Sequence, residues 1–257
     1  QTNAAMASPP SSGPADVNFP YYIRQRKDVD TFHCRISFKG GSYYETAQTQ
    51  GHTFVLSKFL EKAAEARLEA YNVQPKAFSG IHSYGLDIYG DAKDAPAALA
   101  ETFQCLAQPD FESLPQKQII ANCKDTSGKI LWYLKDEFLL KQKLFGDHSY
   151  AFMPMGTPKT IEAAQTADLL KRHQQSAHQN HLVIAYAGPQ DEDTVAALLK
   201  QEAGRLSTRP TTLHTPPAVT PHFAGTKYEA GPAKERRKIR IAHKGLPYGH
   251  EDYVALE

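Results

Sequence analysis

Residues 31–40 constrain the fold more than any other stretch, because their apolar and polar side chains alternate without a break. The apolar members are Phe32, Cys34, Ile36 and Phe38. A period of two predicts a β-strand with one face against a hydrophobic core. Residues 19–26 predict a second strand, which a polar turn joins to the first. A sheet with one apolar face needs a layer of helices to cover that face.

The helices that would form this layer follow in the sequence. Apolar residues recur at helical spacing in residues 54–71, and charged side chains fill the other face. Strands are predicted over residues 77–89, broken at Gly80 and Gly85, and over residues 181–186. Further helices are predicted over residues 96–107, 115–123, 129–144, 157–173 and 191–205. This order indicates an α+β fold with a mostly antiparallel sheet and helices packed on one face.

Composition divides the chain into four parts. Residues 1–18 are polar and proline-rich and predict a disordered leader, and residues 19–206 predict one α+β domain. Residues 207–236 are rich in proline and threonine and predict a linker, after which residues 237–257 begin a further unit, truncated or cleaved. The first residue is not methionine, which predicts a mature end after removal of a signal peptide and a periplasmic or secreted protein; a trimmed chain is the alternative.

Charge and composition exclude several classes of protein. The chain has 257 residues, a net charge of +1 and three cysteines. A charge so close to zero gives no basis for nucleic-acid binding. No apolar run is long enough to predict a membrane span. Cys34, Cys105 and Cys123 allow one disulfide at most, and the apolar surroundings of the first two predict buried free thiols.

Residues 40–60, GGSYYETAQTQGHTFVLSKFL, connect the second strand to the first helix through an ordered set of signals. The strand ends in a turn at Gly41 and Ser42, and Glu45 follows this turn. After a polar loop, Gly51 stands where the helix begins.

This stretch resembles the opening of the insulinase/pitrilysin (M16) metallopeptidase domain, whose helix carries the inverted zinc motif H-x-x-E-H. In the matching register, Phe54 and Lys58 take the positions of the two histidines, and Ser57 takes that of the general base. A phenylalanine has no lone pair, a lysine is cationic at neutral pH, and a serine is too weak a base to activate water without help. The resemblance therefore implies a protease-shaped domain with no catalytic residue and no metal ligand at these positions.

Three later stretches match the same family in order and spacing. Residues 144–150, followed by Gly156, resemble an aromatic segment that precedes a Gly-Thr turn and a helix. Residues 180–188 resemble a strand that runs from an asparagine to a glycine. Residues 237–257 resemble the start of a second M16-like repeat.

The third zinc ligand of active members is a glutamate, and the matching region, residues 116–135, contains none. The resemblance thus implies a non-catalytic subunit or half that holds no cofactor and builds the peptide-binding chamber of a zinc peptidase. Zinc is expected only in a partner or another domain. The expected partners are a second M16-like domain or subunit and a peptide or unfolded polypeptide, held by strand addition to an exposed sheet edge and by apolar pockets.

The candidates for lining a peptide groove are Tyr43, Tyr44, Tyr84 and Tyr89. Aromatic residues on strands also serve as core residues or cross-strand pairs. Two other functions stay open: the chain is a fragment of an active zinc metallopeptidase whose metal site lies outside it, or a binding and assembly module that keeps only the protease fold. His173, His178 and His181 form the densest histidine cluster, which fits either a transition-metal site or a polar helix end.

Overall fold

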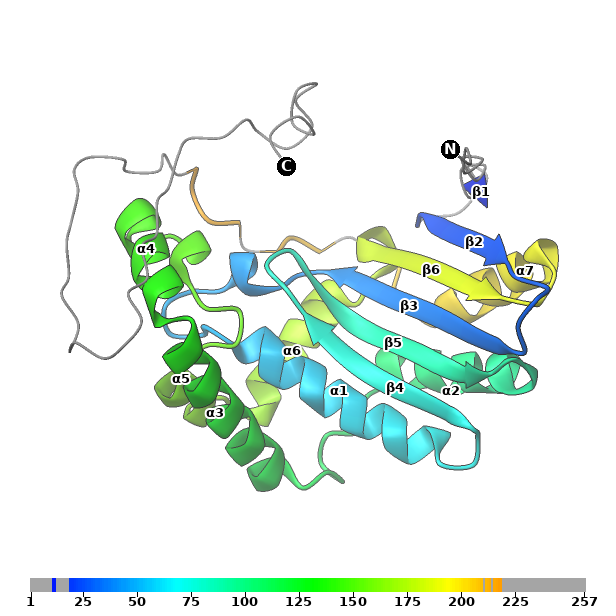
Figure 1. Cartoon of the computed structure of the whole chain (residues 1–257), viewed down its shortest axis with the longest axis horizontal. Helices are drawn as coiled ribbons and strands as arrows, with labels where there is room; N and C mark the ends of the chain where they lie inside the picture. The colour runs from blue at the N-terminus through cyan, green and yellow to red at the C-terminus, as the bar shows by residue number, and fades with distance from the viewer. Residues whose placement is uncertain (1–10, 13–18, 210, 214, 219–257) are drawn as a thin grey trace, which may run out of the picture.

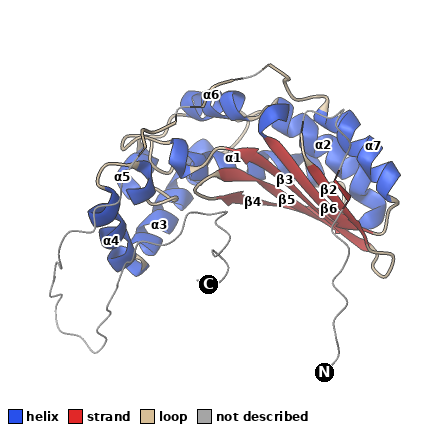
Figure 2. Ribbon diagram, turned by 90° about the horizontal axis from the view of Figure 1, so that it is seen from above, coloured by secondary structure: helices blue, strands red, loops and turns tan. Residues whose placement is uncertain are grey.

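The computed structural model describes residues 11–12, 19–209, 211–213 and 215–218. In these residues, one sheet is covered on one face by helices (Figures 1 and 2). Apart from Ser11–Ser12, the predicted leader lies outside the described residues, as do most of the predicted linker and the whole of residues 237–257.

The sheet has the strand order β1-β2-β6-β3-β5-β4 (Figure 1). Its strands are β1 (Ser11–Ser12), β2 (Tyr21–Gln25), β3 (Thr31–Lys39), β4 (Val73–Ser79), β5 (Ser83–Asp91) and β6 (Leu182–Gly188). Strands β2 and β6 run parallel, and the other neighbouring pairs in the described sheet are antiparallel. The prediction of an α+β fold with a mostly antiparallel sheet is confirmed.

The helices pack on one side of this sheet. Helices α1 (His52–Leu68), α2 (Ala95–Ala107) and α7 (Glu192–Ala203) lie along the covered face (Figure 2). Helices α3 (Gln116–Tyr133) and α5 (Pro158–Glu162) pack beside α1. Helix α6 (Thr166–Ser176) packs against α1, and helix α4 (Lys135–Phe145) packs against α3 beyond the end of the sheet (Figure 1). None of the helices in the described part of the chain is both long and apolar enough to cross a membrane.

Several predicted elements are corrected by the structure. The single strand over residues 77–89 is a hairpin, in which β4 and β5 flank a turn at residues 80–82. Pro75 lies within β4, which tolerates a proline because it is the last strand of the described sheet and pairs on one side only. The single helix over residues 157–173 is two helices, α5 and α6, and α3 continues to Tyr133 beyond its predicted end.

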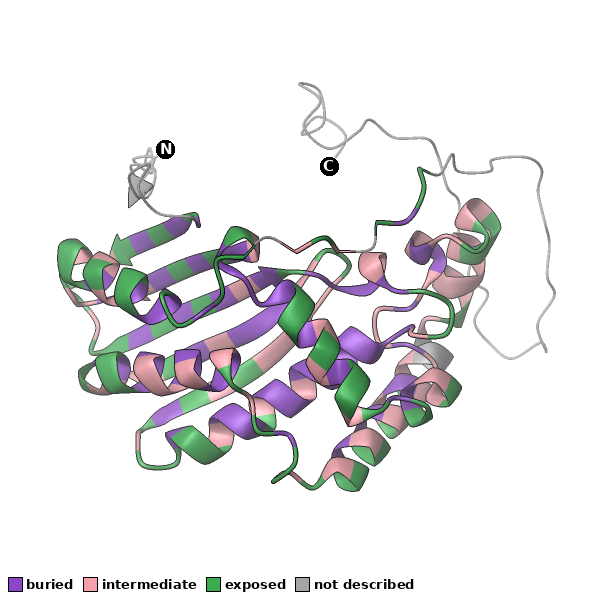
Figure 3. Cartoon of the chain, turned by 180° about the vertical axis from the view of Figure 1, so that it is seen from behind, coloured by how far each residue is buried: buried purple, intermediate pink, exposed green. Residues whose placement is uncertain are grey.

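The core forms between the covered face of the sheet and the inner faces of the helices. Buried residues alternate with more exposed ones along β2, β3 and β6, as the period of two in β3 predicts (Figure 3). Cys34 and Cys105 are buried free thiols, as predicted, and Cys123 is a third. Burial raises the pKa of Cys123 to about 11 and raises that of Cys34 still further, so both stay protonated at neutral pH.

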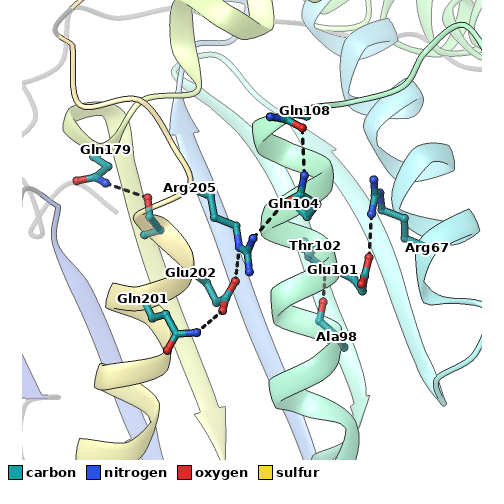
Figure 4. A network of polar contacts seen from close by, with 11 residues as sticks. Arg67, Ala98, Glu101, Thr102, Gln104, Gln108, Gln179, Gln201, Glu202 and Arg205 are labelled. Atoms are coloured by element: carbon teal, nitrogen blue, oxygen red, sulfur yellow. Dashed lines mark hydrogen bonds and ion pairs between the residues drawn. The ribbon is translucent and has the colours of Figure 1, made fainter.

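A polar network holds the outer surfaces of three helices together (Figure 4). The Arg205 Nε donates to Glu202 at 2.6 Å, and the Arg205 Nη1 donates to Gln104 on α2 at 3.1 Å. The Arg67 Nη1 on α1 donates to Glu101 on α2 at 2.9 Å. Because Glu202 is buried, its pairing with Arg205 satisfies a carboxylate that would otherwise be costly to desolvate. These contacts tie α7 to α2 and α2 to α1.

Candidate functional site

The turn after β3 is fastened to the hairpin of β4 and β5. Gly41 has a φ of 93°, and a Cβ there would lie 2.5 Å from the backbone oxygen of Gly80. The backbone N–H of Ser42 donates to Gly80 at 3.1 Å, and that of Tyr43 donates to Ile81 at 2.9 Å. Only glycine fits this position without strain. The glycine and serine of the sequence motif therefore carry the chain past the hairpin turn.

Glu45 then fixes the start of α1. Its carboxylate is 2% exposed and accepts the backbone N–H groups of Gly51 and Thr53, both at 2.7 Å. These N–H groups belong to the helix end that has no partners within the helix. Burial raises the pKa of Glu45, whereas the charge of Arg172 and the two N–H donors oppose that rise.

Replacing Glu45 by alanine is expected to lower the free energy of unfolding by about 2 kcal/mol, because two buried N–H donors lose their acceptor. Urea unfolding followed by circular dichroism measures the change. The control is Glu65→Ala on α1, where the carboxylate of Glu65 pairs with Lys62 and is more exposed than that of Glu45. A loss at Glu45 no larger than that at Glu65 would show that the capping contact contributes nothing.

The start of α1 also touches the segment before α5. A Cβ on Gly51, whose φ is 85°, would lie 2.5 Å from the Cα of Gly156. The backbone of the two glycines is therefore in direct contact. The buried Ser127 Oγ on α3 donates to the backbone oxygen of Gly156 at 2.8 Å. Gly156 thus joins α1, α3 and the segment before α5 at one point.

Helix α1 brings Phe54, Ser57 and Lys58 to one cavity of about 530 Å³. Phe54 and Ser57 are buried, and the Ser57 Oγ donates to the backbone oxygen of Phe54 at 2.8 Å. The Lys58 ammonium donates to both carboxylate oxygens of Glu61, at 3.0 and 2.9 Å. Lys58 is therefore held in an ion pair, and the Ser57 hydroxyl is already used within the helix.

The other walls of the cavity come from β4 and α3. Strand β4 contributes Ala77, Phe78 and Ser79. Helix α3 contributes Ile119, Asn122, Cys123 and Thr126. Met155 and two further residues of α1, Glu61 and Lys62, complete the lining. Helix α3 spans most of the region in which the sequence lacks the third glutamate ligand. The sequence did not indicate the lining residues of α3, because nothing in the spacing of that helix marks the side that faces α1.

The lining of this cavity is chemically mixed, and it includes the charged side chains of Lys58, Glu61 and Lys62. Its lining combines apolar side chains with hydroxyl and amide groups, and the thiol of Cys123 is protonated at neutral pH. Glu61 is engaged by Lys58 and by the backbone N–H of Ala77. Within the described residues, no group of three or more histidine, cysteine, aspartate or glutamate side chains is placed to hold a metal ion.

The structure places the four candidate tyrosines outside this cavity. Tyr43 and Tyr44 stack edge to face, with ring centroids 5.1 Å apart, and Tyr43 lies equally close to Tyr150. Tyr89, which is 41% exposed, donates to Gln74 at 3.0 Å. Tyr43 and Tyr44 adjoin the hairpin turn, whereas Tyr89 lies towards the other end of β5.

Tyr84 is a core residue with 1% exposure. Its hydroxyl lies 2.7 Å from the Ser176 Oγ and 3.1 Å from the His173 Nδ1, so its polar end is occupied as well. It borders a smaller cavity of about 170 Å³ together with Tyr44 and Arg172, but its ring is not exposed to a peptide. For Tyr84, the structure supports the alternative of a core aromatic residue.

The three clustered histidines make contacts within the protein. The His173 Nε2 donates to the backbone oxygen of Leu106 at 2.7 Å. The His178 Nε2 donates to the backbone oxygen of Gln174 at 2.8 Å. The rings of His178 and His181 are 6.1 Å apart. His173 thus links α6 to the end of α2.

No protein-family model matches the sequence, and no curated protein matches it. Solved structures do match the fold. An inactive M16 peptidase domain from Pseudomonas fluorescens has a TM-score of 0.68 at 17% identity and covers 82% of this chain. A protease from Helicobacter pylori has a TM-score of 0.70 at 14% identity over 82% of this chain, and a chain of complex III from Candida albicans has a TM-score of 0.65 at 14% identity over 80%.

This chain spans about half the length of these structures, covering 54%, 54% and 49% of them, respectively. Identities this low establish the architecture only. The chain has the fold of an M16 peptidase domain, and an inactive domain of that family is among its structural matches.

Proposed function

We propose that this chain is a non-catalytic M16-type half or subunit whose cavity beside α1 forms part of the wall of a peptide-binding chamber. Hydrolysis would take place at a zinc ion held by a partner or by another part of the polypeptide. The observation that carries the proposal is that Phe54, Ser57 and Lys58 together line one cavity against β4 and α3. At the positions that would bind zinc in an active domain, this chain has side chains that line a cavity for a peptide.

The cavity is suited to an apolar side chain of a peptide. Phe54, Phe78, Ile119 and Met155 provide apolar surface, and about 530 Å³ accommodates one large side chain. Burying such a side chain stabilises a complex by about 1.5–3 kcal/mol. Lys58 and Glu61 also line the cavity, and their ion pair satisfies both charged groups.

A second candidate function is an assembly module that keeps the protease fold. The match to a chain of complex III favours it, because that structure is a multisubunit complex. The two functions differ in the cavity: an assembly module needs no peptide there, whereas a chamber wall does.

The full chain is expected to bind no stoichiometric zinc and to cleave no peptide, with or without added zinc. It is expected to bind a fluorescein-labelled peptide with one central phenylalanine. Thr126→Trp projects a large ring into the cavity from α3 and should weaken that binding about tenfold, because the phenylalanine loses part of its burial. Metal analysis, a fluorogenic peptidase assay and fluorescence anisotropy measure these quantities.

The matched control is Ala121→Trp, an exposed position on the same helix that does not line the cavity. Its affinity for the peptide should equal that of the unmodified chain. Peptide cleavage by the purified chain with one bound zinc would contradict the proposal. Equal loss of binding in both variants would place the peptide elsewhere and favour the assembly module.

A further inference from the structure

Glu61 connects the cavity to the edge of the sheet. It lies on α1 one turn beyond Ser57 and Lys58, and its side chain is 14% exposed. Lys58 donates to both of its carboxylate oxygens, at 3.0 and 2.9 Å. The backbone N–H of Ala77, in β4, donates to the same carboxylate. The side chain of Glu61, on helix α1, thus accepts the hydrogen bond of a backbone N–H group in β4, the last strand of the described sheet.

The backbone of β4 shows which groups face outward. Strand β4 pairs with β5 only, and neighbouring residues of a strand direct their backbone groups to opposite sides. The N–H of Gly80 donates to Ser83 at 2.8 Å, and the oxygen of Asn72 accepts from Asp91 at 3.1 Å. Even-numbered residues therefore face β5. The outward positions are Val73, Pro75, Ala77 and Ser79.

Two adjacent outward positions offer no free donor. Pro75 has no backbone N–H. The N–H of Ala77 is taken by Glu61. A peptide that added itself to this edge would have to displace the carboxylate from Ala77, and Glu61 would lose a hydrogen bond in a largely buried place. Proteins protect exposed edges against pairing by proline and by charged groups that point at the edge.

We infer that Glu61 and Pro75 close the edge of β4 to strand addition, so that a peptide enters this cavity by an apolar side chain alone. Glu61 then determines that the peptide is recognised through a side chain and not through its backbone. The sequence-based expectation of strand addition is thereby replaced for this edge. The statement about peptides rests on the proposed function, whereas closure of the edge does not.

Closure is tested without any ligand. In Glu61→Ala the amide of Ala77 loses its acceptor, so its hydrogen exchange should become at least about tenfold faster by NMR. The freed edge should also promote pairing between copies, seen as self-association in sedimentation velocity. In Glu61→Gln the side-chain oxygen still accepts from Ala77, so exchange should stay slow. Glu65→Ala, one turn further along α1, is the control for general loosening of the helix.

Unchanged hydrogen exchange at Ala77 in Glu61→Ala would overturn the inference, as would equal acceleration in Glu61→Gln and Glu61→Ala.

A second experiment uses the fluorescein-labelled peptide with a central phenylalanine and a version of it that is methylated on its backbone nitrogens. Both should bind the unmodified chain equally. In Glu61→Ala the unmethylated peptide should gain about tenfold over the methylated one.

A preference for the unmethylated peptide in the unmodified chain would show that the edge is open, and would overturn the inference. Failure of both peptides to bind would contradict the proposed function alone, because the amide exchange of Ala77 still decides whether the edge is closed.

Discussion

Replacing Gly51 by alanine is expected to lower the free energy of unfolding by about 4 kcal/mol, the largest effect of any substitution considered. The φ of 85° is unfavourable for alanine, and the new Cβ would lie 2.5 Å from the Cα of Gly156. Relief requires moving backbone on both sides of the contact, because no flexible side chain separates the two glycines. Chemical denaturation monitored by circular dichroism measures the loss.

The control for Gly51 is Gly128→Ala. Gly128 lies within α3, and its nearest neighbour would be the Pro158 Cγ at 3.7 Å, an ordinary contact. Alanine there should stabilise the protein by about 0.5–1 kcal/mol, because glycine is a poor helix former. Equal effects of the two substitutions, in sign and size, would show that the contact with Gly156 is not a constraint.

Acidification is expected to remove about 3 kcal/mol of stability through His173 alone. Burial lowers the pKa of His173 to about 4, although its hydrogen bond to Leu106 opposes the shift. The unfolded chain binds a proton near pH 6.5, so between pH 6.5 and about 4 it holds more protons at this site than the folded chain. Stability is therefore full above pH 6.5 and falls as the pH falls towards 4.

The measurement compares the free energy of unfolding across this pH range in the unmodified chain and in His173→Gln. The glutamine carries no charge at any pH, so the part of the slope that belongs to His173 should disappear. His82→Gln, at an exposed histidine in the hairpin turn, should keep the slope. Parallel curves for the unmodified chain and His173→Gln would show that the imidazole is not kept neutral by burial.

The spacing of apolar residues predicted those helices and strands in which a single periodicity runs through the whole element. The alternation in β3 gave its bounds to within one residue, because one face meets the core and the other does not. Gly51 and Gly156 were each recognised as motif positions far apart in the sequence. Only the structure shows that they touch each other, since contact between distant segments leaves no mark on local spacing.

The hairpin and the cavity were harder to predict for different reasons. Pro75 lies between the helix predicted over residues 54–71 and the strand predicted over residues 77–89, and only its place on a sheet edge makes it compatible with a strand. Glu61 follows Lys58 at helical spacing, which indicates an ion pair but not its bond to Ala77. The side of α3 that faces the cavity depends on how two helices pack, and its sequence contains no signal for that.

If the cavity binds a peptide as proposed, the junction at Gly156 has a consequence for the energetics of that binding. Two of the three cavity walls, α1 and α3, are joined there by a backbone contact and by the hydrogen bond from Ser127. Their spacing is therefore set before anything enters. A preorganised cavity loses little conformational entropy when a ligand binds. Its affinity therefore depends on how well the ligand fits its shape, and not on a conformational change of the protein.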